Sequence, residues 1–292
     1  MNSSLDPARP ERRPRHRHHV VPISAICVPH VLTVTSGKGG VGKTNFTANL
    51  GWLLRQTRRR VMLLDANLGL ANLDIVLGLN PAFNIAHVLS GEKTVQEVLI
   101  KGPAGLRVLP ANSGIQSITN LSEGQKILLL EEIEALKEQF DYILIDTGAG
   151  IADNVIYFSL AAQTIIVLIT PEPTSIIDAY ALIKVLASNY HQDAFKIVVN
   201  DVANEEEATE AFEKLTQITD HYLNVSMDFL GVIPHDPCLR EAVRLRRPFC
   251  QVFPDGPAAQ GLRRIARRVA EMKHNPLDCD LGFLWRTALM SA

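Results

Sequence analysis

The sequence predicts an α/β fold with a doubly wound, mainly parallel sheet flanked by helices. Three observations support this class. Short runs of β-branched and aliphatic residues alternate with helical patterns along the chain. Two of these runs end directly in an aspartate, and polar residues at the carboxyl ends of strands mark the ligand-binding edge of open parallel sheets. A glycine-rich stretch follows the first run, and it indicates a site for phosphate.

The glycine-rich stretch reads TSGKGGVGKT and matches the pattern G-x-x-x-x-G-K-[ST] of a phosphate-binding loop. Backbone N–H groups of such a loop cradle phosphates at a helix N-terminus, where Lys43 can reach the β- and γ-phosphates and the Thr44 hydroxyl can bind Mg²⁺. A strand at 31–34 and a helix from Asn45 onward supply the order that the motif requires. The residues expected to contact the nucleotide here are Gly37, Lys38, Gly39, Gly40, Val41, Gly42, Lys43, Thr44 and Asn45.

Two further strands are predicted to end in carboxylates. Residues 61–64 form a continuous apolar run that ends in Asp65, and residues 142–145 form a second one that ends in Asp146. Because the carboxyl ends of parallel strands meet at one edge of a sheet, both aspartates are candidate Mg²⁺ ligands together with Thr44. The Gly-rich segment TGAG after the second aspartate suits a loop that senses the γ-phosphate, and an Asp-initiated turn is the simpler alternative.

Capping residues and apolar spacing predict the remaining elements. Asn84, Thr94 and Ser122 are expected N-caps, the last in a capping box with Gln125. The predicted helices cover residues 85–89, 95–100, 122–139, 174–188, 205–222 and 257–273, and further strands cover 106–109, 164–169 and 196–199.

The ends of the chain differ from the predicted domain of residues 31–275. Residues 1–30 are rich in Pro, Arg and His and are expected to be disordered. Residues 276–292 have an amphipathic pattern that is too short to span a bilayer. It suits either an interfacial membrane anchor or a helix packed on the protein's own surface. Its apolar positions, spaced i, i+3, i+4 and i+7, are Leu281, Leu284, Trp285 and Ala288.

Composition excludes several classes of function. The 292 residues are 47% hydrophobic, which is enough for one large core, and the net charge of −2 gives no overall signal for nucleic-acid binding. The four cysteines form no CxxC pair, which argues against a zinc site and favours a reducing, cytosolic location. No apolar run is long enough to cross a membrane and no signal peptide is evident, so we expect a soluble or peripheral protein.

A second lysine in the loop, Lys38, departs from the ordinary phosphate-binding loop. The form KGGVGKT resembles the deviant Walker A family of ATPases that includes MinD, ParA and nitrogenase reductase. The resemblance implies a MinD-like P-loop NTPase fold, with ATP or ADP and Mg²⁺ as ligands. It also implies ATP hydrolysis, which Asn67 in place of a family aspartate is expected to make slow, and an ATP-bound homodimer in which Lys38 reaches the nucleotide of the opposing subunit. The iron–sulfur members of the superfamily are disfavoured by the placement of the cysteines.

The same resemblance assigns further residues. The stretch DANLGLANLD, which begins at Asp65, is similar to the switch I region of the family, where a second aspartate orients the attacking water. That position is Asn67 here. The catalytic residues implied are therefore Lys38, Lys43, Asp65 and Asn67.

Two later segments resemble the adenine-contacting parts of the family. VVN ends in Asn200, and GVIPHDP contains Pro234 and Asp236. The resemblance implies that these three residues contact the base. From the residues alone they are polar turns at strand ends.

Within the family, DANLGLANLD, DTGAG and IPHDP most resemble the flagellar-number ATPases of the FlhG (FleN) type. This implies a cytoplasmic protein, peripheral on the inner face of the cell membrane through its C-terminal tail, with an FlhF-like GTPase and flagellar C-ring components as partners. The residues before Val20 lack the DQAxxLR motif with which many such proteins stimulate FlhF.

Two alternatives stay open within the family. One is a MinD-type regulator of the division site. The other is a ParA-like, ATP-dependent DNA-binding partition protein, for which a basic surface is the distinguishing feature; DNA is the less favoured partner. The arginines that would form that surface are Arg244, Arg246, Arg247, Arg263 and Arg267.

Overall fold

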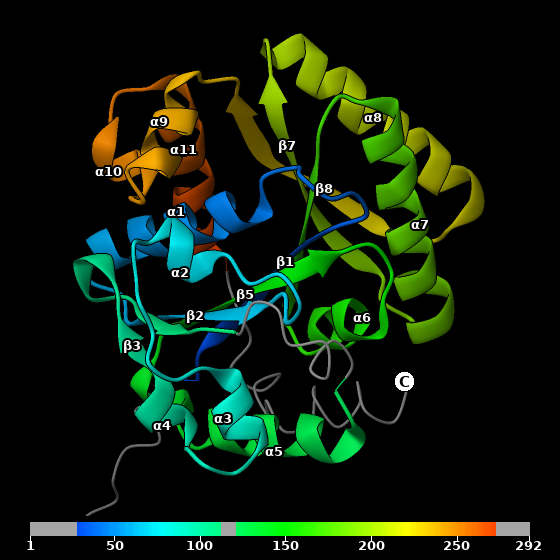
Figure 1. Cartoon of the computed structure of the whole chain (residues 1–292). Coiled ribbons are helices and arrows are strands. Elements are labelled where there is room, and N and C mark those ends of the chain that lie inside the picture. Colours follow the sequence, from blue (N-terminus) through cyan, green and yellow to red (C-terminus); the bar gives the residue numbers. More distant parts are fainter. Residues whose placement is uncertain (1–27, 112–120, 273–292) are drawn as a thin grey trace, which may run out of the picture.

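The computed structural model describes residues 28–111 and 121–272. Over these ranges an eight-stranded sheet has the order β3-β4-β2-β5-β1-β6-β7-β8. Only the short β3–β4 pair is antiparallel, and every other neighbouring pair is parallel. Helices cover both faces of the sheet (Figure 1). The predicted doubly wound, mainly parallel α/β fold is therefore confirmed.

The strands are β1 His30–Ser36, β2 Val61–Ala66, β3 Ile100–Lys101, β4 Arg107–Leu109, β5 Tyr142–Ala149, β6 Thr164–Ile169, β7 Ala194–Val202 and β8 Ser226–Pro234. The helices are α1 Lys43–Gln56, α2 Leu73–Val76, α3 Ile85–Leu89, α4 Val95–Val98, α5 Glu123–Glu134, α6 Asp153–Leu160, α7 Pro173–Tyr190, α8 Glu205–Tyr222, α9 Cys238–Arg244, α10 Phe249–Val252 and α11 Pro257–Glu271. Short 3₁₀ turns occupy Pro103–Gly105 and Lys137–Gln139.

The elements agree with most of the sequence predictions, and the differences have identifiable causes. Ile100 pairs with Val108 in β3 instead of extending α4, because hydrogen bonding to β4 replaces the last helical turn. The segment after Asp146 is the end of β5 and not a turn, since its neighbours extend it on both sides: Thr147 pairs with Ala66 and Ala149 with Ser36. The short helices α2, α6, α9 and α10 were not predicted.

Two further boundaries differ from expectation. The long predicted helix stops at Glu134 and is followed by a 3₁₀ turn. β1 already begins at His30, which the prediction placed in the N-terminal tail. Residues 1–27 and the predicted tail 276–292 lie outside the described residues.

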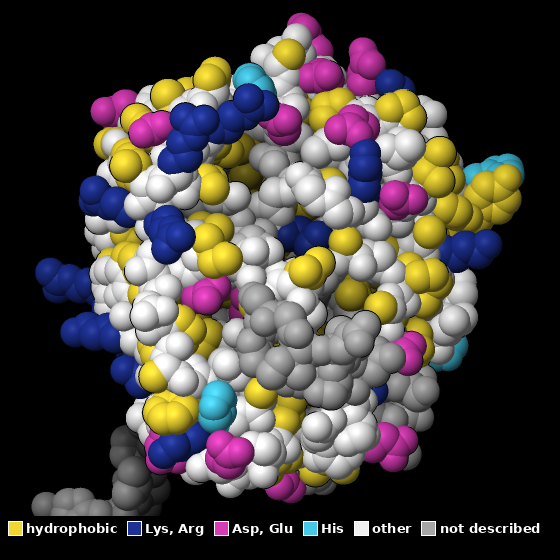
Figure 2. Space-filling model, in the orientation of Figure 1, with side chains coloured by type: hydrophobic (Ala, Val, Ile, Leu, Met, Phe, Trp, Pro, Cys, Tyr) yellow, Lys and Arg dark blue, Asp and Glu magenta, His cyan; other side chains and the backbone are white. Residues whose placement is uncertain are grey.

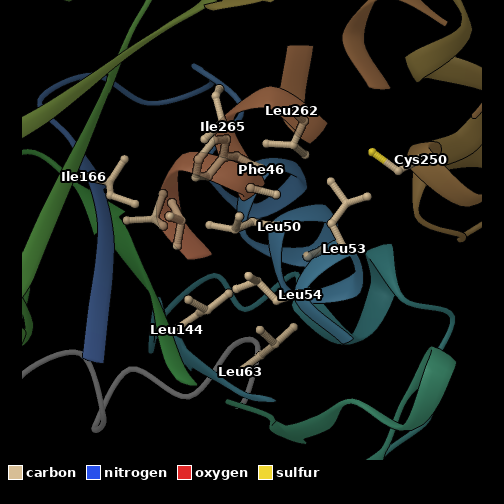
Figure 3. Close-up of a cluster of buried hydrophobic side chains, with 14 of the residues drawn as sticks. Phe46, Leu50, Leu53, Leu54, Leu63, Leu144, Ile166, Cys250, Leu262 and Ile265 are labelled. Carbon is tan, nitrogen blue, oxygen red and sulfur yellow. The ribbon is translucent and has the colours of Figure 1, made fainter. Parts of the chain in front are cut away.

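Helix α1 is held in the middle of the molecule. One face of the sheet is covered by α1, α2, α9, α10 and α11, and α3–α8 cover the other. Figure 3 shows Phe46, Leu50 and Leu54 of α1 lying between α11 and the sheet. Each such side chain contributes about 1.5–3 kcal/mol through burial, so α1 is strongly positioned. Its first residues are thereby held at the carboxyl edge of the sheet.

Close packing of α11 on β8 depends on Gly261. A Cβ added there would lie 2.6 Å from the Val232 carbonyl oxygen and 3.0 Å from the Pro234 ring, so the helix would have to move. We expect Gly261→Ala to lower the free energy of unfolding by about 1–3 kcal/mol, measured by urea denaturation. Gly124→Ala is the matched control, because a Cβ on Gly124 in α5 meets nothing within 4 Å. Equal stability of the two variants would contradict the close packing.

Candidate functional site

The phosphate-binding loop takes a conformation that its glycines allow. Gly40 and Gly42 have φ values of 78° and 96°, in the left-handed region that favours glycine, and Gly42 is the N-cap of α1. Gly37 is needed for a different reason, since a Cβ there would lie 2.0 Å from the Asp178 carbonyl oxygen of α7. The loop is thus packed between α1 and α7, with the N-terminus of α1 available to an anion.

Lys43 lies folded back over this loop. Its Nζ donates to Ser36 Oγ at 2.7 Å, and the Ser36 hydroxyl donates to the Lys38 carbonyl oxygen at 2.6 Å. The side chain is buried, and burial lowers the pKa of Lys43 while the charge of Asp146 opposes this. A phosphate at the loop can replace the Ser36 hydroxyl as the acceptor of this ammonium group.

The structure brings the three predicted metal-binding residues together. Asp65 and Asp146 are register partners in the β2–β5 pairing, and both are buried. Thr44 Oγ1 donates to Asp146 Oδ2 at 2.7 Å, and Thr47 donates to the other carboxylate oxygen at 3.3 Å. Two strand ends and the first turn of α1 therefore converge on one point.

Asp65 also organises the loop that follows it. Its carboxylate accepts backbone N–H bonds from Asn67 at 3.1 Å, Asn72 at 3.0 Å and Leu73 at 3.1 Å. These bonds tie the segment between β2 and α2 to the end of the sheet. Asp65 thus has a structural role that the sequence prediction did not include.

The buried carboxylates make this point electrostatically suited to a cation. Burial raises the pKa of Asp65 to about 8, with the charge of Asp146 adding to the effect and three backbone N–H bonds opposing it. Burial also raises the pKa of Asp146 to about 6, against the hydrogen bond from Thr44 and the charge of Lys43. Carboxylate and hydroxyl oxygens are hard ligands, so the donor set fits Mg²⁺.

A Mg²⁺ ion here would take only part of its shell from the protein. Among residues 28–111 and 121–272, no group of three or more His, Cys, Asp or Glu side chains could hold a metal ion. Mg²⁺ commonly keeps several waters and binds through one or two carboxylates plus phosphate oxygens. Thr44, Asp65 and Asp146 would therefore hold the ion together with a nucleotide.

A cleft of about 890 Å³ opens over these residues. Figure 2 looks into this hollow, in which a basic side chain is visible. Its rim carries exposed apolar side chains, among them Leu70, Ile75 and Val243. The phosphate-binding loop and the start of α1 line one end of the cleft with Gly39, Gly40, Gly42, Lys43, Thr44 and Asn45. The segment after β2 contributes Asn67, Leu68 and Asn72, and the end of β5 contributes Thr147 and Gly148.

Asn67 lies in this cleft, half-buried, with its side chain engaged. Its Nδ2 donates to the Leu70 carbonyl oxygen at 2.8 Å, and Asn72 Nδ2 donates to the same oxygen at 2.8 Å. The side-chain oxygen of Asn67, Oδ1, faces Gly148: a Cβ added to Gly148 would lie 3.4 Å from it. The amide therefore reaches from the predicted switch I segment toward the end of β5.

Of the three predicted base-contacting residues, Asn200 contacts the phosphate-binding loop, and none of the three lines this cleft. Asn200 Nδ2 donates to the Val41 carbonyl oxygen at 2.8 Å, which connects β7 to the phosphate-binding loop. Pro234 ends β8. The buried Asp236 accepts from the backbone N–H groups of Cys238 at 3.0 Å and Ala258 at 3.4 Å. Contact of these residues with a base stays a prediction.

Lys38 is not among the residues that line the cleft. Its Nζ forms an ion pair with Glu172 and donates to Thr174 Oγ1 at 2.9 Å, at the start of α7. Glu172 and Lys38 side chains are 63% and 32% exposed, so this pair is accessible and contributes little to stability. The two lysines of the loop thus point to different places.

Sequence reasoning missed four residues that shape the site. Ser36 and Thr47 hold Lys43 and Asp146, and both could have been found: Ser36 lies within the loop motif, and Thr47 lies one helical turn after Thr44. Glu172 and Thr174, which hold Lys38, have no local signal, because they are more than 130 residues away in the chain.

The cysteines and the predicted basic surface, which the sequence analysis considered for metal and DNA binding, form no further site in the described residues. The free cysteines of the described residues are Cys238, which is exposed, and Cys250, which is buried; Cys27 and Cys279 lie outside them. Arg244, Arg246 and Arg267 of the predicted basic surface are exposed. Within the described ranges, no helix is long and apolar enough to cross a membrane.

A parallel sheet, a glycine-rich loop at the start of α1 and a carboxylate pair beside it define a P-loop nucleotide-binding protein. Residues 32–249 match the family model of the CobQ/CobB/MinD/ParA nucleotide binding domain, and the chain belongs to this family. The antiactivator FleN of Pseudomonas aeruginosa is 43% identical over 82% of this chain and 85% of that protein. The flagellum site-determining protein YlxH of Helicobacter pylori is 34% identical over 80% of each chain.

Solved structures agree with this assignment. The septum site-determining protein MinD from Pyrococcus horikoshii, complexed with Mg-ADP, superposes with a TM-score of 0.71 at 26% identity. The match covers 83% of this chain and 96% of that one. The MinD-like P-loop fold implied by the sequence is confirmed.

The position of Lys43 leads to a test of nucleotide binding. Removal of its ammonium group should cost a charge-assisted hydrogen bond, so we expect Lys43→Ala to weaken the affinity for ATP with Mg²⁺ about ten- to hundredfold. Isothermal titration calorimetry would measure this. Lys184→Ala, at an exposed position of α7, is the control and should bind as the unmodified protein does. Unchanged affinity in Lys43→Ala would show that the loop does not hold the phosphates.

Proposed function

We propose that this protein is a dimeric switch that binds and hydrolyses ATP and regulates the number and placement of flagella. It acts from the cytoplasm and associates with the inner face of the cell membrane when ATP has driven dimerisation. An FlhF-like GTPase and components of the flagellar C-ring are its proposed partners. The identity of 43% to an antiactivator named FleN and 34% to a flagellum site-determining protein supports the flagellar role.

The observation that carries the switch mechanism is the position of Lys38. A lysine inside the loop motif would be expected to serve the nucleotide of its own subunit, yet Lys38 is outside the cleft lining and is held by Glu172 and Thr174. These contacts are exposed and easily exchanged. Lys38 is therefore available to neutralise phosphate charge on a second subunit that approaches the rim of the cleft.

The cellular role is tested by deletion of the gene in its own host. We expect cells with an altered number or position of flagella, counted by electron microscopy, and normal division. Minicells or filaments with normal flagella would instead favour a MinD-type division role, which the structural match to MinD keeps as the second candidate.

Dimerisation is tested by changing Lys38. Lys38→Ala should abolish ATP-dependent dimerisation, because the charge that bridges the subunits is lost, while ATP binding stays within about threefold. Gel filtration with ATP and Mg²⁺ gives the readout. Thr174→Ala is the control: it removes only the hydrogen bond within the subunit, so dimerisation should persist. A Lys38→Ala protein that still dimerises normally would refute the mechanism.

Hydrolysis is expected to be slow because Asn67 stands at the proposed water-positioning place. Its carbonyl oxygen can accept a hydrogen bond from water, but an amide is a far weaker proton acceptor than a carboxylate. Mg²⁺, when bound, supplies charge neutralisation at the phosphates. Lys38, Lys43 and the loop N–H groups provide positioning, so some turnover is preserved.

We expect Asn67→Asp to raise single-turnover ATP hydrolysis about tenfold or more, since a positioned general base typically contributes about 10²- to 10⁴-fold. The substitution also removes the hydrogen bond from Asn67 to the Leu70 carbonyl oxygen. Asn72→Asp removes the matching bond to the same oxygen without placing a carboxylate at the proposed water, and should leave the rate unchanged. A fall in rate for both variants would mean that Asn67 acts by holding the loop.

The C-terminal tail provides the proposed membrane contact. One short amphipathic segment binds a bilayer marginally, whereas two in a dimer gain from effective concentration. Trp285→Glu should abolish ATP-dependent sedimentation with anionic liposomes and leave ATP binding intact. Thr287→Glu adds the same charge away from the apolar positions and should retain most of the binding. If Trp285→Glu sediments as well as the unmodified protein, the tail is not the anchor.

A further inference from the structure

The sheet ends at β8, which is an edge strand. It pairs with β7 on one side, and no strand of the described chain pairs with its other side (Figure 1). α11 packs on one face of β8, in a core cluster with Leu230 and Ile233, and α8 packs on the other face with Val232. An exposed sheet edge is a place where proteins recognise a further polypeptide segment.

A small pocket of about 240 Å³ lies at this edge, between α8 and α11, and we call it the edge pocket. No residue lines both the edge pocket and the nucleotide cleft. Its volume is below the range of about 300–1,000 Å³ that is usual for sites of small-molecule ligands. The edge pocket therefore has room for about one side chain of a partner, and not for a second nucleotide.

The floor of the edge pocket is apolar. Phe229 of β8 remains 37% exposed there, although its ring packs on Phe212 of α8 with the ring centroids 5.2 Å apart. Ile265 of α11 lines the pocket beside it, and Gly231 lets the helix come close, because a Cβ on Gly231 would lie 2.6 Å from Ile265 Cγ1. An apolar side chain placed in the pocket would cover the exposed part of the Phe229 ring.

The wall formed by α11 carries two arginines, Arg264 and Arg268. They are four residues apart and so lie on the same face of the helix. Arg268 Nη1 donates to the Leu230 carbonyl oxygen at 2.7 Å, which fixes this guanidinium group at the strand edge. Among the residues that the structure describes, neither arginine forms an ion pair with an acidic side chain.

The edge pocket has an excess of positive charge. Glu205, in the first turn of α8, is the acidic residue of the lining, so the two arginines outnumber it. Two other acidic side chains nearby are already engaged: Asp228 pairs with Lys196, and Glu207 accepts from the Ala203 backbone N–H at 2.6 Å. Like charges four residues apart destabilise a helix unless an anion offsets them. The pocket thus combines an apolar floor with an unfilled demand for an anion.

We propose that the edge pocket binds an acidic peptide segment of a partner protein, with one apolar side chain against Phe229 and an adjacent carboxylate on Arg264 and Arg268. The site lies apart from the nucleotide cleft, so the inference goes beyond the proposed ATP switch. Guanidinium groups bind carboxylates through two parallel hydrogen bonds, and Arg268 is already oriented, so little freedom is lost on binding. The apolar floor favours a peptide over a nucleic-acid backbone, whose phosphates and sugars are polar.

The test is fluorescence anisotropy with the full-length protein and a short labelled peptide in which aspartates flank a central leucine. Arg264→Gln should weaken peptide binding about tenfold, because a charge-assisted hydrogen bond to the carboxylate is lost. Thr209→Phe should weaken it by a similar factor, since Thr209 lines the α8 wall and the larger ring fills the pocket. Peptides with asparagine in place of aspartate, or alanine in place of leucine, should also bind about tenfold more weakly.

Matched controls separate the pocket from general charge and from folding. Arg267→Gln removes the same charge from α11 at an exposed position that does not line the pocket, and Gln217→Phe adds the same ring at an exposed position of α8. Both controls should bind the peptide as the unmodified protein does. The melting temperatures of Arg264→Gln and Thr209→Phe should not fall, because both positions are exposed. Peptide affinity should be the same with ADP and with ATP and Mg²⁺.

The outcomes distinguish this inference from its alternatives and from the proposed function. Absence of peptide binding, or equal weakening by Arg264→Gln and Arg267→Gln, would overturn it. A nucleotide-free dimer that Arg264→Gln dissociates would show that the edge binds a second copy of the chain instead. Binding of a DNA duplex, but not of the peptide, in an Arg264-dependent manner would make the site a nucleic-acid contact. If ATP fails to dimerise the unmodified protein while the peptide binds as expected, the switch is refuted and the edge pocket stands.

Discussion

The pairing of β2 with β5 is the constraint on which the site depends. It places Asp65 directly opposite Asp146 at the same edge of the sheet. Both carboxylates are buried there, which raises their pKa values and makes the position favourable for a cation. Helix α1 completes the arrangement, because its burial between α11 and the sheet holds Thr44 within hydrogen-bond distance of Asp146.

Side-chain hydrogen bonds connect the nucleotide site to distant parts of the fold. Asp65 holds the segment that follows β2, Asn200 holds Val41, and Glu172 and Thr174 hold Lys38. Each contact joins the nucleotide site to a different element. The phosphate-binding loop is therefore held directly by residues of β7 and of the start of α7.

The two edges of the sheet differ in chemistry. The carboxyl edge of the sheet carries the phosphate-binding loop, the acidic pair and an apolar rim formed by residues such as Leu70 and Ile75. At the amino edge, the turn after α1 carries the exposed Arg58 and Arg59. α1 connects the two edges directly, since Lys43 begins it and Arg58 follows its end.

The sequence by itself determined the fold class, most elements and the phosphate-binding loop. These features depend on local signals: apolar runs, capping residues such as Asn84 and Ser122, and a motif with fixed spacing. It also indicated Asp65 and Asp146 as candidate metal ligands, because a polar residue directly after an apolar run can be recognised from the sequence alone. The resemblance of the motifs to a known family then supplied roles for Lys38 and Asn67.

Tertiary structure alone decided how those residues are held. The partners of Lys38 lie more than 130 residues away, and the continuation of β5 through Ala149 depends on strands at both of its sides. Asp236 caps backbone groups of Cys238 and Ala258, which no local pattern predicts. These contacts form between segments that only folding brings together. A sequence shows which side chains are available, whereas packing determines which of them meet.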